Sequence, residues 1–198
     1  MTRNDTNPSL RDDVPVGPAI ALLELGSVAR GMEVADAILW EADIEMLFAG
    51  TVQPGKYVML FTGSIDDLRS AVRQGSELAG CALVDQLLIP QVHPQIEAAL
   101  RRSDGHVEGS IDALGVVETT TVASSILAAD VALKGATVDL LELRIANGLG
   151  GKSFYTLTGE VSDVRSAVAG GAQEAERGGH LAHQVVIARP HPDLVRFL

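Results

Sequence analysis

Five histidines and one cysteine are the side chains of this chain best suited to bind a metal or act as a base. His180 and His183 lie three residues apart and could share a metal ion, but no carboxylate or thiol motif accompanies them. Cys81 stands alone, so neither an intrachain disulfide nor a thiolate-held zinc or iron–sulfur site is expected. We therefore predict no metal and no cofactor, and we interpret the two histidines as loop residues that face solvent.

The two remaining histidines with a recognisable setting are His93 and His191, each followed by proline. An imidazole in such a turn can cap backbone groups or touch a neighbouring molecule. Catalysis would need a nucleophile with a base or paired carboxylates, and the chain has no Ser-His-Asp order, phosphate loop or dinucleotide fingerprint. The sequence therefore predicts a protein that is not an enzyme.

Charge and hydropathy exclude further classes of partner. The formal net charge is −11, and no basic cluster offsets it, which disfavours nucleic acid and anionic membranes as partners. Nowhere do about 18 apolar residues run together, as a membrane span would require. With its single cysteine, the chain is expected to be soluble and cytoplasmic.

An internal repeat organises the chain. The segment 21–43 aligns with 115–137, where Glu118 follows Glu24 by 94 residues (118 − 24). The segment 55–72 aligns with 151–168 at an offset of 96 (152 − 56), and 89–100 aligns with 187–198 at an offset of 98 (191 − 93). Each change of offset marks an insertion of two residues, and insertions are tolerated in loops rather than in strands.

Domain boundaries follow from the repeat. We predict a flexible N-terminal tail at residues 1–18, a first domain at 19–100, a polar linker at 101–112 and a second domain at 113–198. The tail is polar and contains three prolines, and the linker matches nothing in either copy.

Hydrophobic periodicity gives the same element order in both copies. In the first copy, short apolar runs predict strands at 20–25, 45–49, 57–62 and 84–89, with helical spacing at 28–42. Ser64, with Asp67 three residues on, predicts the start of a second helix that ends near residue 79. The expected fold is α+β: two tandem, ferredoxin-like domains, each a four-stranded, mostly antiparallel sheet with helices on one face.

The ordered motifs resemble those of the bacterial microcompartment shell domain. The second copy carries Glu118, Ala128-Ala129-Asp130, Lys134, Thr158-Gly159 and Ile187-Ala188-Arg189-Pro190-His191-Pro192. The first copy carries Glu24, Ala35-Asp36, Thr62-Gly63 and Ile89-Pro90-Gln91-Val92-His93-Pro94. The resemblance runs from about residue 19 to residue 198, and two such domains in one chain are similar to the tandem, trimeric members of the family.

This resemblance implies a structural role. Three chains would supply six domains and form a flat, pseudohexagonal homotrimer that packs edge to edge in the shell, with a pore for metabolites on its axis. Hexameric and pentameric shell proteins are then the expected partners, and enclosed enzymes are further candidates. The rival hypothesis is a trimeric α/β module that binds a small ligand between subunits and forms no lattice.

The resemblance also assigns candidate pore residues, because family members line the pore with the loop between the second and third strands. In this chain that loop is Gln53-Pro54-Gly55 in the first copy and Ala146-Asn147-Gly148-Leu149-Gly150-Gly151 in the second. Their backbone amides and small side chains would select metabolites by size and dipole. From composition alone, the same segments are ordinary hairpin turns. Because the second loop is longer, a true sixfold pore is excluded.

Edge contacts are assigned in the same way. Lys134 and Arg189 match the family's edge lysine and arginine, whereas the first copy has Trp40 and Gln91 at these positions. Without the repeat, Lys134 and Arg189 read as solvated surface residues and Trp40 as a core residue. As an edge residue, Trp40 would be an interface anchor. His93 and His191 complete the predicted edge contacts.

Overall fold

The computed structural model describes residues 10–101, 111–145 and 148–196. The chain divides into two compact units. The first unit contains the described residues of Pro8–Val92 and Ala146–Gly151, and the second unit those of His93–Ile145 and Lys152–Leu198. The second unit thus includes residues from the end of the first sequence copy, and the first unit includes a loop from the second copy.

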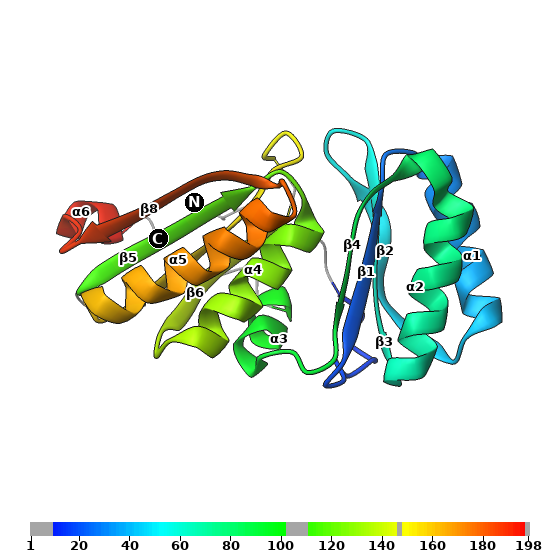
Figure 1. Ribbon diagram of the computed structural model, residues 1–198, viewed down its shortest axis with the longest axis horizontal. Helices are drawn as coiled ribbons and strands as arrows, with labels where there is room; N and C mark the ends of the chain where they lie inside the picture. Colours follow the sequence, from blue (N-terminus) through cyan, green and yellow to red (C-terminus); the bar gives the residue numbers. More distant parts are fainter. Residues whose placement is uncertain (1–9, 102–110, 146–147, 197–198) are drawn as a thin grey trace. The chain divides into compact units, whose positions relative to one another are not determined.

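The first copy forms a four-stranded sheet with the order β2-β3-β1-β4. Every pair of neighbouring strands is antiparallel. Helices α1 and α2 cover one face of this sheet (Figure 1). The elements follow one another as β1 (Ile20–Leu25), α1 (Val28–Glu41), β2 (Ile44–Val52), β3 (Lys56–Gly63), α2 (Ile65–Ala79), a short 3-10 turn (Gly80–Ala82) and β4 (Leu83–Ile89).

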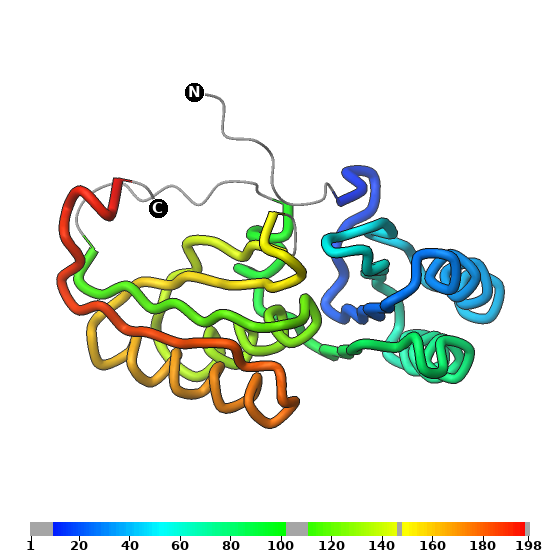
Figure 2. Tube along the Cα trace, turned by 90° about the horizontal axis from the view of Figure 1, so that it is seen from above, coloured from blue at the N-terminus to red at the C-terminus, as the bar shows by residue number. Residues whose placement is uncertain are grey.

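The second copy repeats this arrangement with the strand order β6-β7-β5-β8. Its pairs are also antiparallel, and α4 and α5 lie along one side of the sheet in both views (Figures 1 and 2). The elements are β5 (Ala113–Thr119), α4 (Val122–Gly135), β6 (Asp139–Ile145), β7 (Ser153–Gly159), α5 (Val161–Arg177) and β8 (Leu181–Ala188). The predicted α+β architecture is confirmed, with sheets that are antiparallel throughout.

Helix starts follow from side-chain caps. Ser27 Oγ accepts from Arg30 N, and Thr121 Oγ1 accepts from Ser124 N at the equivalent point of the second copy. At the start of α2, Asp67 N donates to Ser64 Oγ over 3.2 Å, as the spacing of these two residues predicts. Each contact supplies an acceptor for a backbone amide that has none within the helix.

The two copies fill the space between the first helix and the third strand differently. A Cβ on Gly31 of α1 would lie 2.5 Å from the ring of Tyr57 on β3, so only glycine fits there. The repeat replaces this glycine and tyrosine by Ser125 and Ser153, both fully buried. In the first copy a tyrosine on the strand faces a glycine on the helix, whereas in the second copy two serines take these positions. Both combinations fill the space between helix and sheet.

Two helices that follow the fourth strands were not predicted. Helix α3 (Pro94–Arg101) contacts β6 and α4 within the second unit (Figure 1). Helix α6 (Pro192–Val195) occupies the matching position after β8. Since Arg101 is the last residue of α3, the linker predicted to begin there begins after it; residues 102–110 lie outside the described part.

The predicted tail is partly wrong. Leu10, Val14 and Val16 are buried, and Arg11 N donates to Leu47 O of β2 over 2.9 Å. Three apolar side chains therefore fix residues 10–16 to the first unit, because burying them removes apolar surface from water. Residues 1–9 lie outside the described part.

Within the described residues, no helix is long and apolar enough to cross a bilayer.

Candidate functional site

The first candidate pore loop is a tight turn between β2 and β3. Gln53, Pro54 and Gly55 are exposed, and Gly55 N donates to Val52 O over 3.0 Å. Gly55 has a φ of 115°, a conformation that only glycine adopts without strain. The turn predicted from the sequence at this position is confirmed.

The second candidate loop joins β6 to β7 and is richer in glycine. Gly148, Gly150 and Gly151 all have positive φ, whereas Ala146 and Asn147 lie outside the described residues. Gly148 and Gly150 are exposed and Leu149 is half-buried. Gly151 is buried, and a Cβ there would lie 2.6 Å from Pro54 Cδ. The two candidate loops are therefore in close contact within the first unit.

A lysine fixes this contact. Lys56 Nζ lies 2.8 Å from Glu24 Oε1 and donates to Gly151 O over 3.3 Å. The Glu24 carboxylate is fully buried. Such a buried ion pair keeps the carboxylate and the ammonium together, because either charge left alone would be strongly destabilising. In the second copy, Lys152 Nζ lies 3.0 Å from Glu118 Oε1, and both side chains are more exposed.

The predicted edge residues Lys134 and Trp40 end equivalent helices. Lys134 Nζ lies 2.5 Å from Asp130 Oδ2 one turn earlier, with 43% of its side chain exposed. Trp40 is 85% exposed, so the interpretation of this tryptophan as a core residue is wrong. With Met32 and Leu39, which are also exposed on α1, this indole presents apolar surface to water.

The other predicted edge residues follow β4 and β8. Gln91 and Arg189 are both exposed. Arg189 has a φ of 51°, the only positive value at a described residue other than glycine, and its N donates to Asp112 O over 2.7 Å. The backbone bond holds the arginine at the end of β8 while its guanidinium stays in solvent.

The two predicted edge histidines lie in matching turns. His93 Nδ1 accepts from Gln95 N, and His191 Nδ1 accepts from Asp193 N, so each imidazole caps the helix that follows it. His93 N also donates to Asp130 Oδ1 of α4 over 2.8 Å, within the second unit. Asp130 is 3% exposed and accepts from both His93 N and Lys134 Nζ.

Gln95, on α3, was not identified from the sequence. Its Oε1 accepts from Leu140 N of β6 over 2.6 Å, and its Nε2 donates to Val138 O and to Asp139 Oδ1. A glutamine on a short, unpredicted helix gives no signal in a single sequence. Asp130 does, because it belongs to the Ala-Ala-Asp motif.

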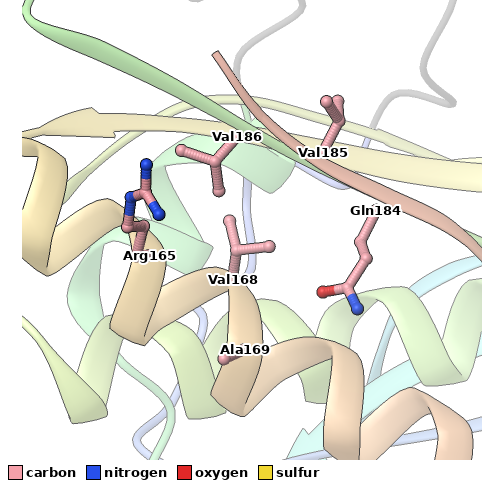
Figure 3. A pocket seen from close by; sticks show the side chains of 6 residues that line it. All are labelled: Arg165, Val168, Ala169, Gln184, Val185 and Val186. Atoms are coloured by element: carbon pink, nitrogen blue, oxygen red, sulfur yellow. The ribbon is translucent and has the colours of Figure 1, made fainter. Parts of the chain in front are cut away.

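A shallow hollow lies between α5 and β8 (Figure 3). Val168 and Val186 face each other in it, while Val185 points away on the other side of the strand. It lacks a carboxylate, an imidazole or a nucleophile. Its lining consists of Arg165, Val168, Ala169, Gln184, Val185 and Val186.

Among the described residues, His180, His183 and Cys81 do not form a common metal site. His180 Nδ1 is 3.1 Å from Thr120 Oγ1, His183 is exposed on β8, and Cys81 is exposed in the turn after α2. Over the described ranges, no three His, Cys, Asp or Glu side chains gather in a way that could hold a metal ion.

Comparison with known proteins decides the family. The model of the BMC domain matches residues 19–92 and again 113–190. The chain belongs to the BMC domain family. The duplication and the antiparallel sheets are therefore two BMC domains in tandem.

Relatives agree over nearly the whole chain. The bacterial microcompartment shell protein PduT of Citrobacter freundii is 39% identical over 181 residues, which cover 90% of this chain and 96% of that protein. The carboxysome assembly protein CcmO of Synechocystis sp. is 28% identical over 192 residues, 91% of this chain and 64% of that one.

A solved structure is similar as well. The crystal structure of a microcompartments protein from Desulfitobacterium hafniense DCB has a TM-score of 0.75 and 45% identity, and covers 90% of this chain and 98% of that one. The chain is a bacterial microcompartment shell protein, from a structural family rather than an enzymatic one. It therefore assembles with shell proteins.

Proposed function

We propose that this shell protein is a homotrimer that forms a pseudohexagonal tile of the shell around a central pore. The main support for this proposal is the pair of complete BMC domains in one chain, since three chains then supply six domains. Closed cyclic symmetry brings the same loop of each chain to the axis, which is how repeated turns can line one channel. Hexameric and pentameric shell proteins are the proposed partners at its edges, and enclosed enzymes are further proposed partners.

The pore is proposed to be lined by Gln53-Pro54-Gly55 alternating with the segment 146–151. Support comes from the contact of Lys56 Nζ with Gly151 O and from the close approach of Gly151 to Pro54, which bring the two loops together. Glycine-rich turns expose backbone dipoles at low steric cost, so such a pore would select small polar metabolites by size and dipole orientation.

The tile edges are proposed to be of two kinds. One presents Lys134 and Arg189, and the other presents Trp40 and Gln91, with His93 and His191 nearby. The 85% exposure of Trp40 supports an interface role, because a buried aromatic anchor often dominates the energy of a contact. A fused pair of domains can place unlike residues on alternating edges, which six identical domains cannot do.

Two measurements test this proposal. Native mass spectrometry of the purified protein should give a mass of three chains, and negative-stain electron microscopy with partner shell proteins should show hexagonal tiles or sheets. A protein that remains a single chain at micromolar concentration contradicts the proposal. Tight binding of a small metabolite by a trimer that never forms a lattice would favour the ligand-binding alternative.

Substitution tests the edge. Trp40→Lys should weaken assembly with partner tiles without changing the trimer mass, and Arg73→Ala, on the exposed surface of α2, is the control. If Trp40→Lys forms sheets with partner tiles as the wild type does, the proposed edge role of Trp40 is contradicted.

A further inference from the structure

The face of α1 differs from the equivalent face of α4. Met32, Asp36 and Leu39 lie on one stripe of α1 at helical spacing, and all three are exposed. Their counterparts Ile126, Asp130 and Leu133 on α4 are all buried. At the first of these positions the exposed fraction falls from 56% for Met32 to 0% for Ile126.

A segment of the same chain lies against α4. Helix α3 contacts α4 and β6, His93 N donates to Asp130 Oδ1, and Ile96 on α3 is fully buried. All of these residues belong to the second unit. The chain thus contains one complete example of a contact between the end of one BMC sequence copy and the first helix of the other.

The matching segment at the end of the second copy has no such cover. Ile96 corresponds to Leu194 at the offset of 98 residues (194 − 96), and Leu194 is 41% exposed. His93 corresponds to His191, which is exposed. The same chain therefore displays both halves of the contact uncovered, namely α6 with its preceding turn and the face of α1.

We propose that the segment from His191 through α6 of one chain docks on the α1 face of a second copy of this chain. His191 N donates to the Asp36 carboxylate of that copy, and Leu194 packs near Met32 and Leu39. The repeat identifies the docking segment, because the matching segment of the first copy, His93 with α3, already packs on α4 within this chain. This inference rests on the proposed trimer and gives its interface a residue-level register.

A second contact has the same direction. Lys56 of the first sequence copy donates to Gly151 O of the second, within the first unit. Shifting both residues along the repeat pairs Lys152 with Gly55 O of a neighbouring copy. A Cβ on Gly55 would have nothing within 4 Å in the isolated chain, so a carbonyl-to-lysine approach there is sterically open.

The sheets show the same inequality. Leu87 on β4 is 3% exposed, whereas the equivalent Val185 on β8 is 40% exposed. Each buried surface of one copy is thus matched by an exposed surface on the other. Head-to-tail contacts between unlike surfaces propagate from chain to chain and close into a ring when the rotation allows it.

Disulfide trapping tests the register, with the repeat supplying its own control. The backbone nitrogen of His93 lies 2.8 Å from Asp130 Oδ1. A contact of this length is compatible with an α-carbon separation that a disulfide can span, roughly 4–7 Å. The double variant Asp36→Cys with His191→Cys, made with Cys81→Ser to remove the exposed native thiol, should give linked two-chain and three-chain species on mild oxidation.

The control is Asp130→Cys with His93→Cys in the same background. It should lose its free thiols at the mass of a single chain, because both positions lie in one unit. Each single-cysteine variant should give no three-chain product. A wild-type protein that has a trimer mass while the Asp36/His191 variant does not cross-link would overturn the register and leave the proposed trimer standing. A wild-type protein of single-chain mass would overturn the trimer itself.

Charge reversal gives an independent measurement. Asp36→Arg should shift the native mass from three chains to one at micromolar concentration, because it replaces the acceptor for His191 N by a cation. Glu77→Arg, at an exposed site on α2, should leave the mass unchanged. Equal trimer stability in the two variants would contradict the proposed contact.

Discussion

The two glutamate–lysine pairs occupy equivalent positions of the two sequence copies and differ in burial. Glu24 is fully buried with Lys56 mostly covered, whereas Glu118 and Lys152 keep 36% and 51% of their side chains exposed. Identical residues at equivalent positions of the repeat therefore contribute differently to stability, because the strength of an ion pair depends on its access to water. Duplication therefore kept the motif and changed its surroundings.

The largest expected effect comes from breaking the buried pair. Glu24→Gln leaves the Lys56 ammonium without its counter-charge, and we expect a loss of about 3 kcal/mol in the free energy of unfolding. Glu118→Gln should cost less than about 1 kcal/mol. Urea unfolding of both variants, at one protein concentration and followed by circular dichroism, measures the difference. Equal losses would show that the pairs are energetically alike.

Packing of the helices offers a second comparison. Gly31→Ser introduces a side chain 2.5 Å from the Tyr57 ring, and we expect a loss of roughly 2 kcal/mol from overpacking. The reciprocal change Ser125→Gly removes a hydroxyl that has no hydrogen-bond partner, and should change stability by less than about 1 kcal/mol. Thermal unfolding of the two variants checks this, and a larger loss for Ser125→Gly would refute the packing argument.

The third comparison concerns α3. Gln95→Asp should lower stability by about 1–2 kcal/mol, because the shorter carboxylate loses the bond to Leu140 N and places a negative charge near Asp139. Hydrogen exchange at β6 reports this directly, since Leu140 N should exchange faster. Glu97→Gln, on the same helix, is the control, and equal exchange in both variants would show that Gln95 does not hold α3 in place.

The smallest effect is expected from the reverse change in the second copy. Asp193 corresponds to Gln95, so Asp193→Gln should add a glutamine contact to β2 of the neighbouring chain and strengthen each trimer contact by about 1 kcal/mol. A dilution series analysed by mass photometry would detect a trimer that persists at a concentration several-fold lower. Glu176→Gln, an exposed change on α5, should leave that concentration unchanged. If the concentration is also unchanged for Asp193→Gln, α6 does not contact β2 of the neighbouring chain as α3 contacts β6.

Sequence reasoning found the elements that have strong periodicity or a cap. The strands of both copies, the turn at Gln53-Pro54-Gly55 and the start of α2 at Ser64 all follow from local patterns, because each depends on residues close in sequence. Helix α3 was missed because its stability depends on contacts with β6 and α4, which are distant in sequence.

The N-terminal segment and the edge residues show a different limit. Prolines and charges suggested a tail, but Leu10, Val14 and Val16 supply enough apolar surface to bury. The exposure of Trp40 was one of two open interpretations, since a tryptophan on a helix is compatible with either core or interface until the packing is known. Whether a side chain is buried depends on the whole fold, so its position in the repeat could not predict its burial.

Contacts at the outer strands also affect how the chain behaves when crowded. The outer strands β2 and β6 would present unpaired backbone groups to any other strand. Arg11 N donates to Leu47 O on β2, and the Gln95 side chain accepts from Leu140 N on β6 and donates to Val138 O, just before that strand. These polar contacts leave β2 and β6 less able to add a foreign strand, which lowers the tendency of closely packed copies of the chain to aggregate edge to edge.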